Sequence, residues 1–275
     1  MTSPHPAPPV ALTIAGSDCS AGAGLQADLK TFQHFQVHGL TAATCVVSET
    51  PKVVEAVKTL PASFVESQVR LLLDSYPLTA IKTGMLHSRA VIERVAKCLA
   101  PHATIPLVVD PVMMASSGAP LIEEDAVEAY REFLFPCATL LTPNLHEAEA
   151  LIGGKITGLQ AMEEAARSMS RDTGAAVLVK GGHLGGKDCI DILAEGDQIT
   201  RYSHPRLPDA DTHGTGCTLA AAIAAGLAHG KPLRDAVAKA GDYLAAALAS
   251  RYQFEGPKGI QALNQGTLPK SLDSA

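Results

Sequence analysis

The sequence predicts an α/β fold in which helices cover both faces of a central, mostly parallel sheet. Short runs of apolar and β-branched residues alternate with longer segments of helical spacing along most of the chain, a pattern typical of parallel sheets connected through helices. The 275 residues suffice for one large domain, and 47% hydrophobic against 4% aromatic residues indicates an aliphatic core. A closed barrel is the alternative, but a late hairpin and two terminal helices favour an open sheet.

The first five elements alternate strand and helix. Residues 10–15 are almost continuously apolar and predict a buried strand. Residues 25–35 carry apolar side chains three and four positions apart, which is the spacing of a helix. The same two patterns predict a strand at 40–48, a helix at 64–73 and a short strand at 80–83, which ends at a glycine.

The middle of the chain continues this alternation between the two patterns. In chain order, they predict a helix at 90–99, a strand at 107–109, a helix at 124–133, a strand at 139–141, and a helix opened by Thr142-Pro143-Asn144 that runs through Leu151. Each of these strands ends directly at a polar residue, so the strand ends are expected to carry polar side chains.

The last part of the chain contains the expected hairpin. A helix is expected at 162–171 and a strand at 176–179. Residues 190–194 and 199–202 flank the turn Glu195-Gly196-Asp197-Gln198 and therefore predict two antiparallel strands. Two apolar, alanine-rich segments of helical spacing close the fold, at 218–228 and 233–249.

The two ends of the chain are expected to lie outside the domain, which covers residues 10–259. Residues 1–9 contain four prolines and predict a disordered leader. They lack the basic segment and apolar run of a secretion signal. Residues 260–275 are polar and predict a peripheral tail. No apolar run reaches the ~20 residues that span a bilayer, so we expect a cytoplasmic protein without membrane contact.

Charge and cysteine content exclude several classes of protein. The net charge is −6 and the pI is about 5.9, and no basic cluster with interleaved aromatic residues is present, which argues against nucleic acid as a partner. The six cysteines are scattered without a C-x-x-C pair, so neither a zinc site nor a disulfide framework is expected.

The most informative segment is Asp211-Thr212-His213-Gly214-Thr215-Gly216-Cys217-Thr218, which leads directly into an alanine-rich helix. Gly214 and Gly216 allow the backbone to turn tightly and to direct successive N–H groups at one point, where the positive end of the helix dipole also lies. The pattern therefore predicts an anion site faced by Cys217. The alternative is an ordinary helix start capped by Thr215 or Thr218, with Cys217 as a small buried residue.

Six further polar motifs follow expected strands. They are Gly16-Ser17-Asp18, Ser48-Glu49-Thr50, Lys82-Thr83-Gly84-Met85, Asp110-Pro111-Val112-Met113, Thr142-Pro143-Asn144-Leu145-His146-Glu147 and Lys180-Gly181-Gly182-His183. Any one of them could be an ordinary turn or helix cap. Because ligands bind at the carboxyl ends of strands in open α/β sheets, six such motifs on one edge together with the anion turn favour a ligand site.

Three residues of these motifs have the chemistry of a phosphate site. Asp110 and Glu147 carry the carboxylates that Mg²⁺ prefers, although Asp110 could be a solvated or capping residue, and the position of Glu147 in the first turn of a helix is favourable in any case. Lys180 is flanked by glycines and could reach phosphate oxygens, or it could simply be exposed.

Taken together, these motifs resemble those of the hydroxymethylpyrimidine/phosphomethylpyrimidine kinases of thiamine biosynthesis. The resemblance begins at Gly16-Ser17-Asp18 with Ser20 and Gly22 to Thr31, and it extends in order to the anion turn, over about residues 10–259. It implies the three-layer fold of the ribokinase-like superfamily. The chain has no Gly-x-x-x-x-Gly-Lys-Ser/Thr match, so the phosphate loop is not of the Walker type.

The resemblance also implies the ligands and the residues that bind them. ATP is expected with its phosphates over Gly214, Thr215 and Gly216, and Mg²⁺ near Asp110 and Glu147, with Lys180 offsetting charge on the transferred group. The remaining implied contacts are to the nucleotide from Asn144, Lys180, Gly182 and His213, and to the pyrimidine from Gly16, Asp28, Glu49, Met85 and Val112. A homodimer is also implied.

Cys217 is expected to act as the base or to orient the substrate. A thiol at a helix N-terminus should have a depressed pKa, although a neighbouring triphosphate would raise that pKa again. The resemblance leaves both protonation states open.

Three positions differ from the family pattern. Glu49 stands where the family has Gln, Ser116 replaces a Lys, and Ala21 replaces a Gly. A Gln amide can both accept and donate, whereas a carboxylate can only accept, so the Glu49 substitution bears on the identity of the substrate. The alternatives are a vitamin B6 kinase and a non-catalytic ligand-binding homologue.

Overall fold

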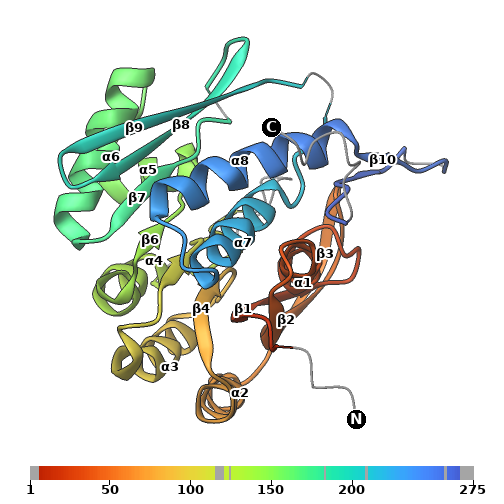
Figure 1. Cartoon of the computed structure of the whole chain (residues 1–275), viewed down its shortest axis with the longest axis vertical. Helices are drawn as coiled ribbons and strands as arrows, with labels where there is room; N and C mark the ends of the chain where they lie inside the picture. The colour runs from red at the N-terminus through yellow and green to blue at the C-terminus, as the bar shows by residue number, and fades with distance from the viewer. Residues whose placement is uncertain are drawn as a thin grey trace.

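The computed structural model of the chain describes residues 6–114, 121–123, 125–182, 184–207, 210–256 and 259–266. Within these residues, nine strands form one sheet in the order β3-β2-β1-β4-β5-β6-β7-β8-β9. Strands β2, β1, β4, β5, β6 and β7 pair in parallel, whereas β3, β8 and β9 pair antiparallel with their neighbours. The predicted open, mostly parallel sheet is therefore confirmed (Figure 1).

The strands of this sheet are β1 (Val10–Asp18), β2 (His38–Thr50), β3 (Val53–Thr59), β4 (Leu78–Thr83), β5 (Leu107–Val109), β6 (Leu140–Leu141), β7 (Ala176–Val179), β8 (Asp188–Glu195) and β9 (Gln198–Pro205). The helices are α1 (Gly24–His34), α2 (Ala62–Ser75), α3 (Arg89–Leu99), α4 (Ala126–Ala129), α5 (Leu145–Ile152), α6 (Leu159–Thr173), α7 (Thr215–Ala228) and α8 (Leu233–Ala249). A two-stranded ribbon, β10 (Tyr252–Gln253) and β11 (Gln261–Ala262), follows α8.

Two apolar clusters hold the three layers together. Alternate side chains of a strand point to opposite faces, so Leu12 joins the cluster under α2 to α6, while its neighbour Ala11 joins the cluster under α1, α7 and α8. Both residues are fully buried. The inner parallel strands β1, β4, β5, β6 and β7 are covered on both faces and are therefore largely apolar, as the sequence indicated. Polar side chains gather at the strand ends, and the buried Thr13 and Lys82 are exceptions inside the strands.

Three features differ from the sequence prediction: the strand β3, the broken helix at 124–133 and the ribbon β10–β11. β3 was not expected, because residues 53–59 are mostly exposed and lie at the sheet edge, paired with β2 through the turn at Pro51 and Lys52. The predicted helix at 124–133 is instead the short helix α4, a π turn at Tyr130–Leu134 and a 3₁₀ turn at Phe135–Cys137. Pro136 within this 3₁₀ turn cannot continue an α-helix. Glu124 lies outside the described residues.

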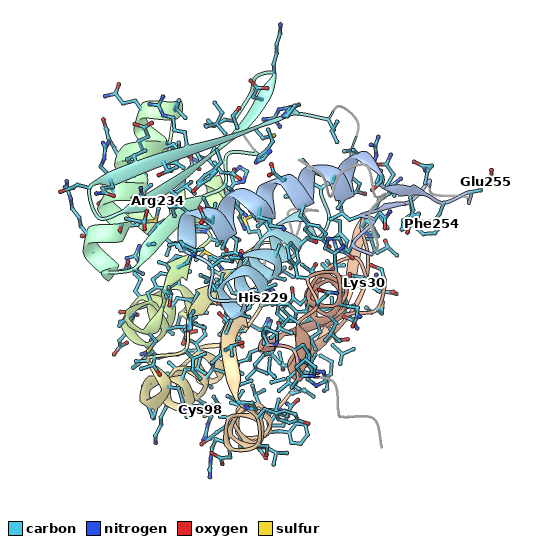
Figure 2. All side chains as sticks on the ribbon, viewed as in Figure 1. Lys30, Cys98, His229, Arg234, Phe254 and Glu255 are labelled. Carbon is cyan, nitrogen blue, oxygen red and sulfur yellow. The ribbon has the colours of Figure 1, made fainter. Side chains whose placement is uncertain are left out.

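The chain ends also differ in part from expectation. Residues 6–9 form neither helix nor strand, and the rest of the expected leader is outside the described residues. The tail was expected to be peripheral from residue 260, yet Leu263 and Gln265 are buried against the domain. By contrast, Phe254 and Glu255, just after β10, project away from the domain (Figure 2). Residues 267–275 are not among those described.

The close approach of β7 and β8 generates the first prediction. A Cβ atom on Gly181 would lie 1.8 Å from the carbonyl oxygen of Ile190, whereas one on Gly182 would meet nothing within 4 Å. Gly181→Ala should therefore lower the free energy of unfolding by ~1–3 kcal/mol or more, because backbone must move. Gly182→Ala, the matched control, should change it by less than ~1 kcal/mol. Chemical denaturation of both variants measures this, and equal stabilities would contradict the close approach.

Candidate active site

A cavity of about 620 Å³ lies at the carboxyl ends of the parallel strands, where ligands bind in open α/β sheets. All the predicted site residues except Asp28 line it. They are Gly16, Glu49, Met85, Asp110, Val112, Asn144, Glu147, Lys180, Gly182, His213, Gly214, Thr215, Gly216 and Cys217. The fold therefore brings together residues from seven separate motifs. Ser116 and His183 lie outside the described residues.

Gly214 lies within the anion turn, which comprises residues 211–218. It is the N-cap of α7 with φ of 78°, and a Cβ atom there would lie 2.0 Å from the carbonyl oxygen of Gly22, so only glycine fits. The alternative that Thr215 or Thr218 caps the helix is wrong, because no side chain among the described residues caps α7. The Thr215 hydroxyl instead donates to the carbonyl of Thr212, at 2.8 Å. The N–H of Thr215 donates to the carbonyl of Thr212 at 3.2 Å, so Gly216 and Cys217, which both line the cavity, supply the first-turn amides of α7 that an anion could reach.

Lys180 lies beside this turn. Its ammonium group is 2.8 Å from Oδ1 of Asp110, and that same oxygen accepts a hydrogen bond from the Thr142 hydroxyl at 3.1 Å. Burial lowers the pKa of Lys180, but Asp110 and Glu147 raise it by more, so the net shift is upward. A Cβ atom on Gly216 would lie 3.0 Å from Nζ of Lys180. Lys180 is thus a cation held against the anion turn by its ion pair with Asp110, and it is not simply an exposed side chain.

Glu147 is buried and holds the start of α5. Its Oε2 accepts from the backbone N–H of Asn144 at 2.8 Å, and Oδ1 of Asn144 accepts from the N–H of Glu147 at 3.0 Å, which forms a capping box. Oε1 of Glu147 accepts from the N–H of Met113 at 3.1 Å. Burial and the charge of Asp110 raise the pKa of Glu147, and Lys180 opposes them. The carboxylate therefore fixes two segments that line the cavity.

Cys217 differs from expectation in its acidity. Burial raises the pKa of this thiol to about 11, although Lys82 and a hydrogen bond from the Gly24 backbone lower it. The expectation of a depressed pKa considered the helix N-terminus but not the burial, which disfavours the charged thiolate. At neutral pH, Cys217 is therefore a thiol.

Asp28 does not line the cavity, which corrects its prediction as a substrate-binding residue. It is fully buried, accepts from the Thr13 hydroxyl at 2.6 Å and pairs with Lys82, whose Nζ is 2.8 Å from Oδ2. Burial lowers the pKa of Lys82, but Asp28 outweighs this and the net shift is upward. Lys82 also lowers the pKa of Cys217. The pair therefore affects this thiol although neither of its residues lines the cavity. A lysine inside the apolar strand at 80–83 was the signal for it.

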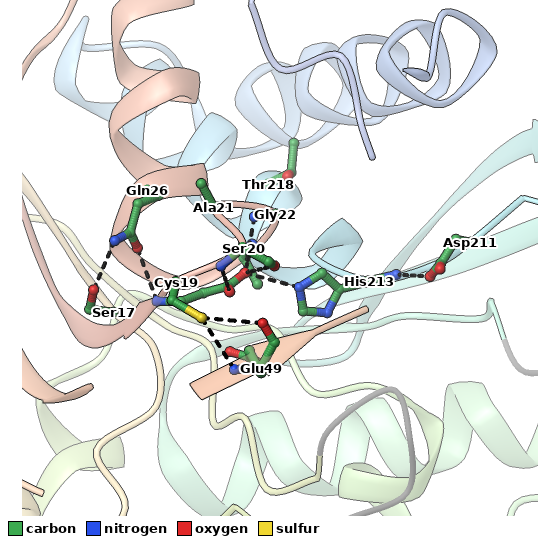
Figure 3. A network of polar contacts seen from close by, with 12 residues as sticks. Ser17, Cys19, Ser20, Ala21, Gly22, Gln26, Glu49, Asp211, His213 and Thr218 are labelled. Atoms are coloured by element: carbon green, nitrogen blue, oxygen red, sulfur yellow. Dashed lines mark hydrogen bonds and ion pairs between the residues drawn. The ribbon is translucent and has the colours of Figure 1, made fainter. Parts of the chain in front are cut away.

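Asp18 and His213 form an ion pair that the sequence did not predict. Figure 3 shows His213 beside the loop residues Ser20 and Gly22. Asp18 accepts from the backbone N–H groups of Ser20, Gly22 and Ala23 at 2.7–3.0 Å and lies 3.0 Å from Nε2 of His213. Although burial opposes ionisation, these hydrogen bonds, led by that of His213, lower the pKa of Asp18 to about 2. Asp18 therefore stays a carboxylate and organises the loop before α1.

Glu49 lies next to this pair at the end of β2. The ligand atoms of Asp18, Glu49 and His213 all lie within 4.8 Å of one another. The Glu49 backbone is fixed by Cys19, whose sulfur accepts from its N–H and donates to its carbonyl, both at 3.3 Å. Burial and the charge of Asp18 raise the pKa of the Glu49 carboxyl, while His213 lowers it. A carboxyl group that readily takes up a proton thus faces the cavity.

The fold and the cavity define a class of protein. A parallel sheet covered on both faces, with an anion turn, a lysine–aspartate pair and a buried glutamate in one cavity, is the arrangement of a phosphotransferase with the ribokinase-like fold. The model of the phosphomethylpyrimidine kinase family matches residues 18–264, and the chain belongs to this family.

Individual relatives agree with this family. The hydroxymethylpyrimidine/phosphomethylpyrimidine kinase of Rhizobium meliloti is 43% identical over 91% of this chain and 94% of its own length. The thiamine biosynthesis bifunctional protein ThiED of Geobacter sulfurreducens is 44% identical over 86% of this chain, which spans 48% of that longer protein. Among solved structures, the pyridoxal kinase of Staphylococcus aureus in complex with AMP-PCP and pyridoxal superposes with a TM-score of 0.86 at 35% identity, covering 95% of this chain and 94% of its own.

The Asp18–His213 pair generates a prediction about stability and pH. Burial lowers the pKa of His213, but Asp18 raises it by more, so that the net shift from 6.5 is upward. A raised pKa contributes stability that is complete below the unfolded-state pKa, about 6.5, and is lost as pH rises through the folded-state pKa. The free energy of unfolding that His213→Gln removes should therefore be larger at about pH 5.5 than at about pH 9. Urea denaturation across this range tests it, with His38→Gln, at an exposed position on β2, as the control. A pH-independent difference would contradict the ion pair.

Proposed function

We propose that the protein transfers the γ-phosphoryl group of ATP to 4-amino-5-hydroxymethyl-2-methylpyrimidine and then to its monophosphate, in thiamine biosynthesis. The observation that carries this proposal is that residues 214–217 of the anion turn lie beside the Lys180–Asp110 pair in one cavity. Backbone amides, a helix dipole and a lysine cation there converge on one point, as transfer of a phosphoryl group requires.

In this proposal, the phosphates of ATP lie over the anion turn. The first-turn amides of α7 hold the charge that develops on the transferred group, and Lys180 offsets it. Asn144 and Gly182 line the same cavity and are assigned to the nucleotide. We assign His213, predicted as a nucleotide contact, to the substrate end, because it lies beside Glu49 and Asp18.

The carboxylates fit Mg²⁺ as the bound metal. Oδ1 of Asp110 is engaged by Lys180 and Thr142, whereas Oδ2 lies 3.6 Å from the Cβ position of Gly216 and is directed at the anion turn. Asp110 would hold the ion through Oδ2, and Glu147, whose two oxygens already accept from backbone N–H groups, would contribute the second carboxylate that Mg²⁺ prefers. When bound, the metal would neutralise phosphate charge.

The pyrimidine would lie at the other end of the cavity, against an apolar wall. Met85 and Val112 pack with Cys45, Val47 and Leu121 there. Gly16 permits the close approach of Cys45 to this wall, because a Cβ atom on Gly16 would lie 2.7 Å from the sulfur of Cys45. Glu49 supplies the polar contact to the ring. In the first reaction, the hydroxymethyl oxygen forms the new P–O bond, its proton passes to water, and the bond between the γ-phosphorus and the leaving oxygen of ADP breaks. In the second, a phosphate oxygen of the monophosphate forms the new P–O bond and ADP leaves in the same way.

An assay with three acceptors tests this function. Release of ADP is measured with ATP, Mg²⁺ and either the hydroxymethyl pyrimidine, its monophosphate or pyridoxal. We expect turnover with both pyrimidines. Turnover with pyridoxal alone would replace the proposal with a vitamin B6 kinase, the alternative that the similarity to the S. aureus pyridoxal kinase supports. Absence of turnover with all three would indicate a ligand-binding homologue.

Cys217 generates a prediction about rate. With a pKa of about 11, only about one Cys217 in 10⁴ is a thiolate at pH 7, so its main contribution would be to orient the attacking oxygen. Because the smaller serine would hold the attacking oxygen in a different place, Cys217→Ser should lower kcat by ~10²-fold or more, while near-isosteric replacement leaves stability almost unchanged. Steady-state kinetics with thermal denaturation as the control measures both. An unaltered kcat would reduce Cys217 to a packing residue.

Glu49 generates a prediction about pH. A carboxylate facing an unprotonated ring nitrogen would oppose lone pair to lone pair, at a cost of ~1–3 kcal/mol or more, unless the carboxyl or the ring takes up one proton. The KM of wild type for the pyrimidine should therefore fall as pH falls from about 7.5 to about 5.5. Glu49→Gln, which can accept and donate at any pH, should bind tightly with a flatter profile. Identical profiles in both proteins would exclude contact between Glu49 and the ring.

Two further properties stay predictions. None of the helices in the described part of the chain is long and apolar enough to cross a membrane. We propose a cytoplasmic location on the character of the sequence, and a homodimer on the family resemblance; sedimentation equilibrium would test the dimer.

A further inference from the structure

The segment after β10 returns to the cavity and inserts a glutamine between the loops that form the site. Gln265 is 2% exposed. Its side-chain Nε2 donates to the carbonyl oxygen of Gly22 at 3.0 Å and to the hydroxyl of Thr218 at 2.9 Å. Its backbone carbonyl accepts from the hydroxyl of the buried Tyr243 on α8, at 2.9 Å. One amide group thus joins the loop before α1 to the first turn of α7.

The carbonyl that Gln265 holds is in contact with the anion turn. The oxygen of Gly22 would lie 2.0 Å from a Cβ atom on Gly214, so these two backbone segments touch. The N–H of Gly22 donates to Asp18 at 3.0 Å, and Asp18 pairs with His213 of the same turn. Gly22 is therefore the point where the tail, the Asp18–His213 pair and the N-cap of α7 meet.

A second glutamine of the same segment holds the start of the anion turn. Oε1 of Gln261 accepts from the backbone N–H of Asp211 at 3.0 Å and from the Arg251 guanidinium at 3.1 Å. The Asp211 carboxylate in turn accepts from the N–H of His213 at 3.0 Å (Figure 3). Both ends of the turn, at Asp211 and at Thr218, are consequently bound to the segment 260–266.

We propose that residues 260–266 form a C-terminal latch and that Gln265 is a positioning residue for phosphoryl transfer. The latch sets the loop at 18–24 against the turn at 211–218, and so aligns the first-turn amides of α7 with the group being transferred. Rates of transfer depend steeply on such alignment, because a misplaced donor no longer meets the charge that develops in the transition state. The kinetic consequence rests on the proposed function; the contacts themselves do not.

Two substitutions at Gln265 separate positioning from simple packing. Gln265→Met keeps the shape and removes both hydrogen bonds. Gln265→Glu keeps the shape but sets a carboxylate oxygen against the Gly22 carbonyl. We expect kcat to fall at least ~10-fold for Gln265→Met and further for Gln265→Glu, with KM for the pyrimidine within about threefold. The matched control is Tyr252→Phe, which removes an exposed hydrogen bond to Asn264 within the same tail and should leave kcat unchanged.

A third variant keeps the test decisive if Gln265 cannot be replaced without unfolding. Thr218→Val removes one partner of the amide from the α7 side, and should lower kcat in the same direction. Combined with Gln265→Met, it should add little, because both act through one contact. Hydrogen exchange should also increase at residues 18–24 and 211–218 in Gln265→Met and not in Tyr252→Phe.

The outcomes distinguish the latch from the proposed function. A wild type that turns over neither pyrimidine would overturn the function, and exchange at the two loops would then judge the latch alone. A folded Gln265→Met with wild-type kcat and wild-type exchange would overturn the latch. So would additive effects of Thr218→Val and Gln265→Met.

Discussion

The Lys180–Asp110 pair is the interaction on which the rest of the site depends. Two charges in a half-closed cavity at the sheet edge are costly to remove from water, and the cost is offset only when both are paired and hydrogen-bonded. Asp110 meets this condition with Lys180 and Thr142. The two partners come from the ends of β5 and β7, with β6 between them, so the parallel order of these strands is what makes the pair possible. Gly216 then lets the anion turn approach it.

The pair of Asp28 and Lys82 follows the same rule, that a buried charge needs a partner, at a place without access to solvent. Asp28 and Lys82 are both fully buried, and each satisfies the charge of the other. Their effect on the chemistry is indirect, because neither residue lines the cavity. Burial has the largest effect on the pKa of Cys217, while Lys82 lowers that pKa and Asp28 raises it. Removing one partner would leave the other as an unpaired buried charge, which costs far more than the pair contributes. The site therefore contains two ion pairs: Lys180–Asp110, which lines the cavity, and Lys82–Asp28, which does not.

The sequence predicted the fold and most of the cavity well, for physical reasons. Parallel strands covered on both faces are continuously apolar, so β1, β5 and β7 were recognisable, and the polar residues that end them had to converge. What failed depends on three-dimensional context. Asp28 looked like a ligand contact because a carboxylate in a motif does not reveal that it is buried in an ion pair with Lys82 of β4. The acidity of Cys217 depends on burial, and that of Asp18 on His213, which lies far along the chain. Gln265 was missed because a polar tail carries no pattern that predicts burial.

The contact of Gln265 with Gly22 spans 243 positions in the chain. Contacts of such length close very large loops and form only after the intervening segments are in place. The sheet and its covering helices can be assembled from local and neighbouring pairings, whereas the anion turn receives its last support from a residue near the opposite end of the chain. Full catalytic competence would therefore be acquired late in folding, and a chain with a native sheet but an unlatched tail would be compact and ordered but slower in phosphoryl transfer.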